Sequence, residues 1–90
     1  MILATTTVDN VQKFLEVFGA KGADKREFHG SKGAMVFQDP GDDHRVWAIL
    51  DWDEQGWTNF VTDPEVPAVL KDAGHLSKPE AALMLGSYGA

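Results

Sequence analysis

The alternation of apolar and polar residues along the chain predicts a short strand followed by a helix. Apolar and β-branched residues fill positions 2–8, which is typical of a strand, and the run stops at Asp9. The segment after it is expected to be helical, because apolar residues recur at the spacing of one helix face: Val11, Phe14, Leu15 and Phe18. Asp9 is the expected N-cap, with Gln12 completing a capping box.

The middle of the chain predicts a loop and then two paired strands. Residues 19–33 are polar and rich in glycine, with room for one helical turn over 23–28 that His29 and Gly30 would end. Strands are expected over 34–39 and 44–52, joined by the turn sequence PGDD. This spacing makes the two strands antiparallel neighbours.

A second helical region and a last strand complete the predicted order. Trp57, Phe60 and Val61 have helical spacing behind Gly56, which weakens the first turn. The helix should bend near 64–67, where two prolines lie, resume, and stop at Gly74. Residues 80–88 alternate loosely as a strand. The order β-α-β-β-α-β predicts an α+β fold of the ferredoxin-like class with an antiparallel sheet.

Both faces of the predicted sheet carry large apolar side chains. In the third strand Val46, Ala48, Leu50 and Trp52 point one way, whereas Trp47 and Ile49 point the other way with two charged residues. Two helical regions can cover only one face, which we expect to be the one with Trp52. Since an exposed apolar patch of more than a few hundred Å² is rare on monomers, a second copy of the chain should cover the face with Trp47.

Size and charge narrow the classes of function. A chain of 90 residues forms one domain, 1–90. The net charge of −6, with only eight scattered basic residues, argues against a nucleic-acid surface and against binding to anionic membranes. No apolar run is long enough to span a bilayer. The absence of cysteine excludes disulfides and thiolate sites, and without a signal-peptide pattern the expected location is the cytoplasm.

Two local motifs, together with the order of elements, resemble the dimeric α+β barrel superfamily, especially the small antibiotic-biosynthesis-monooxygenase-like proteins. The first motif is the PGDD hairpin before a strand ending in DW and an acidic residue, and the second is FVTDPEVPAVL, which is similar to a helix of that family. The resemblance covers nearly the whole chain and implies a homodimer. It also implies a pocket between sheet and helices, walled by the tryptophan that corresponds to Trp52. The positions that match the haem-degrading members' tryptophan and histidine are Phe60 and Leu70, which argues against a haem role.

The candidate ligand-binding residues are mostly aromatic. Trp52, Trp57 and Phe60 are either ordinary core or the wall of a pocket, and the two readings overlap in so small a domain. The candidate substrate-binding set is Trp52, Trp57, Phe60, Asn59, Phe14 and Phe18. Arg26 and Asn59 are candidate donors to an oxyanion, although Arg26, within the charged sequence DKRE, fits a solvated helix face better.

The chain has three histidines, at positions 29, 44 and 75, all expected at element ends near water. His29 is the candidate general base, because it leads from the first helical region into the second strand, at the rim of the expected pocket. The histidine spacing matches no metal-ligand pattern, and no nucleotide-binding or nucleophile motif is present, so we expect neither a metal nor another cofactor.

Two hypotheses for function follow. In the first, a homodimer binds a small aromatic or polyketide-like molecule and acts as a cofactor-independent monooxygenase-like enzyme. In the second, the dimer is non-catalytic and serves as a ligand carrier or as a subunit that associates with another protein. A cavity of a few hundred Å³ beside Trp52 would favour the first hypothesis, and a solid core there the second.

Overall fold

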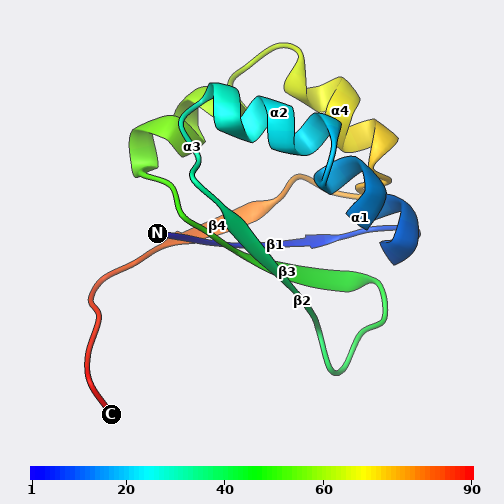
Figure 1. The fold of residues 1–90 in the computed structure, drawn as a ribbon. Helices are drawn as coiled ribbons and strands as arrows, with labels where there is room; N and C mark the ends of the chain where they lie inside the picture. Colours follow the sequence, from blue (N-terminus) through cyan, green and yellow to red (C-terminus); the bar gives the residue numbers. More distant parts are fainter.

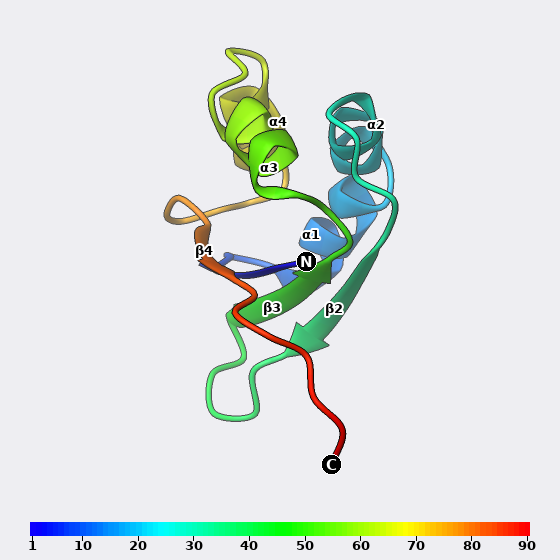
Figure 2. The same ribbon diagram turned by 90° about the vertical axis from the view of Figure 1, so that its left-hand side faces the viewer.

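Residues 1–90, all described by a computed structural model, form a four-stranded antiparallel sheet with four helices on one of its faces (Figure 1). The view turned by 90° shows the helices as a separate layer and the C-terminal segment running away from both layers (Figure 2). In chain order the elements are β1 Ile2–Thr7, α1 Val11–Phe18, α2 Lys21–Phe28, β2 Ala34–Gln38, β3 Arg45–Leu50, α3 Glu54–Val61, α4 Val66–Asp72 and β4 Glu80–Leu83.

The strand order in the sheet is β2-β3-β1-β4. β1 is central and pairs antiparallel with β3, placing Ile2 opposite Leu50, and with β4, placing Ile2 opposite Leu83. β2 pairs antiparallel with β3, as the PGDD turn predicted. The predicted α+β, ferredoxin-like fold is confirmed, with an additional helix, α2, after the first predicted helix and with the second predicted helical region divided into α3 and α4.

The core lies between the helices and the face of the sheet that carries Trp52, as the alternation in β3 predicted. One cluster joins strand residues such as Ile2 and Leu50 to Trp52, to Phe60 of α3 and to Val66 of α4. A second cluster contains Val8, Phe14, Val46 and Ala73 at the other end of the sheet. Five of the nine aromatic residues therefore lie in the layer between sheet and helices: Phe14, Phe18, Trp52, Trp57 and Phe60.

Two predictions near the N-terminus need correction. The N-cap of α1 is Asn10, whose side chain accepts a hydrogen bond from the Lys13 N–H, so Asp9 and Gln12 form no capping box. Residues 21–28, predicted as loop with at most one helical turn, form the complete helix α2. Its predicted end is confirmed, because the chain reverses at Gly30, where φ is +92°.

Two predictions in the second half also need correction. The expected bend at 64–67 is a break between α3 and α4, with Pro67 in the first turn of α4, where a missing N–H is tolerated. The last strand ends at Leu83 instead of continuing to residue 88. Beyond it Leu85 and Tyr88 are almost fully exposed, because no neighbouring strand pairs with them.

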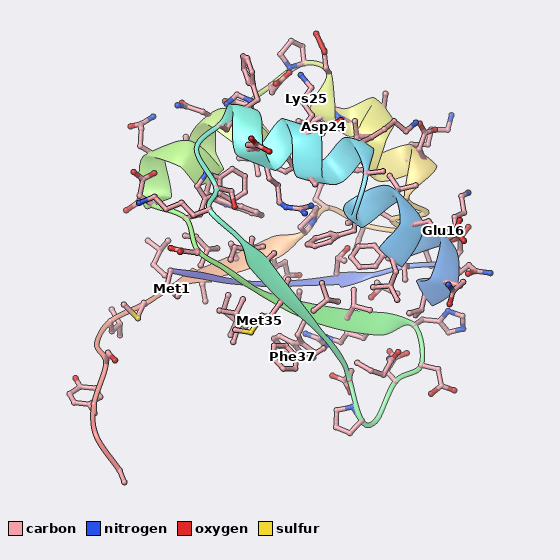
Figure 3. The ribbon with its side chains drawn as sticks, viewed as in Figure 1. Met1, Glu16, Asp24, Lys25, Met35 and Phe37 are labelled. Carbon is pink, nitrogen blue, oxygen red and sulfur yellow. The ribbon has the colours of Figure 1, made fainter.

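The outer face of the sheet, which we define by Leu3, Met35, Phe37, Trp47 and Ile49, has no helix on it. Pairing across the strands sets Leu3, Ile49 and Met35 in one row and places Trp47 beside Phe37 in the next. Met35 and Phe37 point away from the helices (Figure 3) and are 57% and 47% exposed. No helix in the protein has the length and apolar character needed to cross a membrane.

Candidate functional site

A cavity of about 70 Å³ lies between the sheet and the helices, lined mainly by apolar side chains. The strands β1 and β3 contribute its floor, and residues from all four helices contribute its walls. The side chains with polar groups around it include Thr6, Arg26 and His75. An apolar site with a few polar groups at its wall is the usual composition of a small-molecule pocket.

Three aromatic side chains form one wall of the cavity. Trp52 packs edge-on against Trp57 and Phe60, with ring centroids 5.8 and 5.2 Å apart, and Trp57 stacks on Phe60 at 6.0 Å. Trp52 and Phe60 are buried, whereas Trp57 is half-buried. The structure thus brings together the three residues for which the sequence left two alternatives, core or pocket wall. Trp52 and Phe60 belong to the core, Trp57 packs against it, and all three line the cavity.

Trp52 is held in place by a hydrogen bond from its indole Nε1 to the backbone oxygen of His29, at 2.9 Å. This contact requires Gly56, because a Cβ there would lie 2.7 Å from the His29 oxygen and 2.6 Å from Cδ1 of Trp52. The glycine that weakens the first turn of α3 is therefore the residue that lets this helix approach the indole ring.

Two further predicted residues, Phe14 and Phe18 of α1, also line the cavity. Their ring centroids are 5.3 Å apart, and Phe14 is buried. Asn59, by contrast, is exposed on α3, where its side-chain oxygen accepts a hydrogen bond from Gln55. The structure does not bring Asn59 together with the aromatic side chains.

The His29 side chain is not among the groups that line the cavity. Its Nε2 lies 2.8 Å from Oδ2 of Asp63, in the turn between α3 and α4, and its ring packs edge-on against Phe28 and Phe60. Hydrogen bonds from His29, from the Glu65 backbone N–H and from Lys25 lower the pKa of Asp63 to about 2. The pair joins the end of α2 to that turn.

His75, expected near water, lies instead in the cavity wall. Its Nδ1 is 2.9 Å from the hydroxyl of Thr6, and its ring packs edge-on against Phe14. Burial lowers the pKa of His75, so at neutral pH the ring is a neutral imidazole that can accept a proton. Sequence reasoning missed this residue because Val8, which forms a bridge with His75, is distant in the chain and no local motif marks the position.

Arg26 of α2 also lines the cavity. Its side chain is half-buried, so it lies neither fully inside the site nor on a fully solvated helix face. Its guanidinium lies 3.6 Å from the centroid of the Phe18 ring, and its Nη2 donates to the backbone oxygen of Phe18 at 2.9 Å. Burial lowers the pKa of Arg26 to about 10, which leaves the group charged at neutral pH. The side chain is therefore a half-buried cation at an otherwise apolar site.

The site offers a flat apolar surface, one base and one cation. No group of three His, Asp or Glu side chains converges in a way that could hold a metal ion. The imidazole of His75 can take a proton from a bound molecule, and the guanidinium of Arg26 can stabilise the negative charge that results. These are the parts that proton abstraction from an aromatic molecule requires.

The sequence matches no protein-family model and no curated protein. Its structure, however, matches SnoaB, a cofactor-independent oxygenase from Streptomyces nogalater, with a TM-score of 0.69 and 16% identity over 96% of this chain and 92% of that one. The chain has the fold of the antibiotic-biosynthesis-monooxygenase-like proteins.

Two candidate antibiotic biosynthesis monooxygenases share this fold. The protein from Deinococcus radiodurans matches with a TM-score of 0.65 and 13% identity, over 100% of this chain and 98% of that one. The protein from Nitrosomonas europaea matches with a TM-score of 0.65 and 12% identity, over 97% and 88%. The predicted resemblance to these monooxygenase-like proteins is confirmed at the level of the fold.

Proposed function

We propose that the protein is a homodimer that binds a small aromatic molecule between its sheet and helices and oxidises it with molecular oxygen, without a cofactor. The observation that carries this proposal is the cavity, where an aromatic wall, an uncharged imidazole and a guanidinium meet. The shared fold with SnoaB supports the same class of reaction. With no cysteine and no helix able to cross a membrane, we infer that it acts in the cytoplasm.

The proposed chemistry needs a substrate with an acidic CH₂ group next to a phenolic ring. A base removes one proton, and the resulting carbanion is electron-rich enough to react with oxygen. The CH₂ carbon becomes a carbonyl, one oxygen atom enters the product, and the other leaves as water with the two hydrogens. The protein need only exclude water, accept the proton and stabilise the oxyanion.

Two histidines are candidates for the base. His29 was predicted from the sequence, and His75 is favoured by geometry because its ring lies in the cavity wall. His29 already has a carboxylate partner in Asp63, whereas the partner of His75 is the neutral hydroxyl of Thr6. We therefore assign the proton transfer to His75 and a positioning contact to His29.

Dimerisation belongs to the proposal, and the outer face of the sheet supports it. Trp47 and Ile49 are half-buried at its centre, flanked by the exposed side chains of Leu3, Met35 and Phe37. The exposed C-terminal segment adds Leu85 and Tyr88 to the apolar surface outside the helical layer. A second copy is the partner that would cover this surface.

Oxygen consumption in the presence of quinols and anthrones tests the enzymatic part. Turnover without added metal or flavin, lost when either aromatic wall or base is altered, is the expected result. An intact dimer that gives no turnover with any of these compounds would contradict the oxygenase proposal and leave the binding proposal standing.

The size of the cavity favours a second candidate, the non-catalytic dimer that carries a ligand or associates with another protein. A volume of about 70 Å³ is half of the roughly 150 Å³ that allows an engineered cavity to take up one benzene ring. A multi-ring substrate would require the half-buried Trp57 and Leu70 to move. Failure of every aromatic compound to shift the indole resonances of Trp52 and Trp57 would favour association with another protein, whereas binding without turnover would favour the ligand carrier.

A further inference from the structure

The guanidinium of Arg26 is a cation at the cavity without an anionic partner. The four ion pairs of the protein involve Lys21, Lys25 and His29, and none includes Arg26. This is unexpected in a chain with fourteen acidic and eight basic residues, where carboxylates are plentiful. None of its unpaired nitrogens is buried, so these donors are free to bond to water or to a ligand.

The contacts that Arg26 does make hold it in one position. The ring of Phe18 lies against the guanidinium plane, and one of five N–H donors bonds to the Phe18 carbonyl oxygen. Gly22 gives it space, because a Cβ at that position would lie 3.1 Å from Nη1. The remaining donors have no protein acceptor, so the group is oriented but its hydrogen-bonding capacity is mostly unused.

The rest of the cavity wall restricts what can meet those donors. Fourteen of the twenty lining residues are hydrophobic, and the imidazole of His75 is uncharged at neutral pH because of burial. A ligand that complements this wall has a flat apolar body and a single negatively charged oxygen group. Without movement of Trp57 and Leu70, the volume of about 70 Å³ favours a body of a single ring, and even that requires some widening.

We infer that Arg26 forms the anion subsite of the cavity and that the ligand is a single-ring aromatic anion, either a carboxylate or an ionised phenol. This inference rests on the proposed function, since it names the class of molecule that the cavity binds. Arg26 contributes affinity by a charge-assisted hydrogen bond that a neutral analogue cannot replace. The Phe18 ring fixes the direction from which the anionic oxygen approaches.

The test is a comparison of matched ligands by NMR titration, with the indole N–H signals of Trp52 and Trp57 as the readout. Benzoate is compared with benzamide, and ionised 4-nitrophenol with nitrobenzene, so that charge changes while size stays nearly constant. We expect at least one anion to bind about ten-fold more tightly than its neutral partner. The arm that shows the preference distinguishes a carboxylate site from a phenolate site.

Variants then assign the preference to one residue. Arg26→Met should abolish the difference between anion and neutral partner, and Arg26→Lys should keep part of it. Lys32→Met is the matched control, because Lys32 is an exposed cation that lines a separate surface hollow with Arg26 but does not line the cavity, so it should leave the preference unchanged. Should Arg26→Met not fold, the wild-type comparison and Arg26→Lys decide the question.

The outcomes separate this inference from the proposed function. Equal binding of anions and neutral partners to the wild type would overturn the anion subsite while leaving the aromatic-binding cavity intact. A preference that persists in Arg26→Met would also overturn it. No binding of any of the four compounds would overturn the proposed ligand binding itself.

Discussion

At the scale of single residues, the indole of Trp52 is closely packed against α3 and the end of α2. Its hydrogen bond to the His29 carbonyl and its contact with α3 both depend on the missing side chain at Gly56. Gly33, in contrast, has nothing within 4 Å of the position that a Cβ would take, and its φ is not positive. The two glycines thus offer a matched comparison between a packing role and an exposed backbone position.

Replacing Gly56 with alanine should destabilise the protein by about 1–3 kcal/mol, because the added methyl group forces Trp52 or α3 to shift. Gly33→Ala should change stability by less than about 0.5 kcal/mol, since no atom opposes the new group. Urea unfolding followed by tryptophan fluorescence measures both values. Equal stabilities of the two variants would show that the Trp52 contact is not close-packed in solution.

The two candidate bases are separated by a pair of substitutions. His75→Gln should lower turnover at least about a hundred-fold, the usual contribution of a general base, with a smaller change in melting temperature. His29→Ala should retain turnover but lower the melting temperature by several degrees, because Asp63 loses one of its three hydrogen-bond donors. Loss of turnover in His29→Ala with full activity in His75→Gln would return the catalytic role to His29.

At the scale of elements, α2 is the helix that local sequence did not predict, because its residues 21–28 form no apolar stripe. Contacts with distant segments stabilise it. Lys21 pairs with Asp72 at the end of α4, Lys25 pairs with Asp63 and Glu65, and His29 caps the end of the helix beside the same Asp63. These side-chain pairs therefore join α2 to α4 and to the turn between α3 and α4, along one edge of the helical layer that covers the cavity.

Acid should weaken this edge, because it is the ionised form of Asp63 that accepts the three hydrogen bonds. The pKa of Asp63 is about 2 in the folded protein and near 4 when unfolded, so the carboxylate stabilises the fold above about pH 4. That stabilisation is lost as pH falls from about 4 towards 2. The difference in unfolding free energy between wild type and Asp63→Asn should therefore shrink over this interval.

The control for this effect is Asp43→Asn, since Asp43 is exposed and its side chain makes no hydrogen bond or ion pair. Its unfolding free energy should follow that of the wild type across the same pH range. A constant difference between wild type and Asp63→Asn from neutral pH to pH 2 would show that the carboxylate is not the titrating group.

At the scale of the whole molecule, one layer of helices covers one face of the sheet and leaves the outer face open (Figures 1 and 2). The proposed partner is a second copy of the chain against Leu3, Met35, Phe37, Trp47 and Ile49. Trp47 is a less decisive probe than Phe37, because its Nε1 also donates to Asp39 and its ring contacts Arg45 within the same chain. Phe37 makes no such contact and is half-exposed.

The wild type should sediment as a dimer at micromolar concentration, and Phe37→Glu should sediment as a folded monomer, because a carboxylate cannot be buried unpaired at the interface. Trp47→Glu should give a monomer or an unfolded chain. Lys32→Glu, a change at an exposed position, should leave the dimer intact. A monomeric wild type would contradict the proposed homodimer and with it the dimeric α+β barrel.

The amino-acid sequence alone predicted the strands of the sheet, the antiparallel hairpin, the burial of the face that carries Trp52, and the two helical regions. Those features follow from local periodicity, since a side chain two or three to four positions away lies on the same face whatever covers that face. The aromatic wall of Trp52, Trp57 and Phe60 could be predicted for the same reason.

Tertiary structure alone decided the polar part of the site. His29 meets Asp63 across 34 positions of the chain, and His75 meets Thr6 across 69, so neither pairing leaves a local pattern. Arg26 likewise has no ion-pair partner because the carboxylates lie elsewhere in the fold. Residues 84–90 pair with no strand, which also depends on the arrangement of the whole sheet. A polar side chain at the end of an element acquires its burial and charge environment from distant segments, and these determine whether it is solvated, paired or part of a cavity.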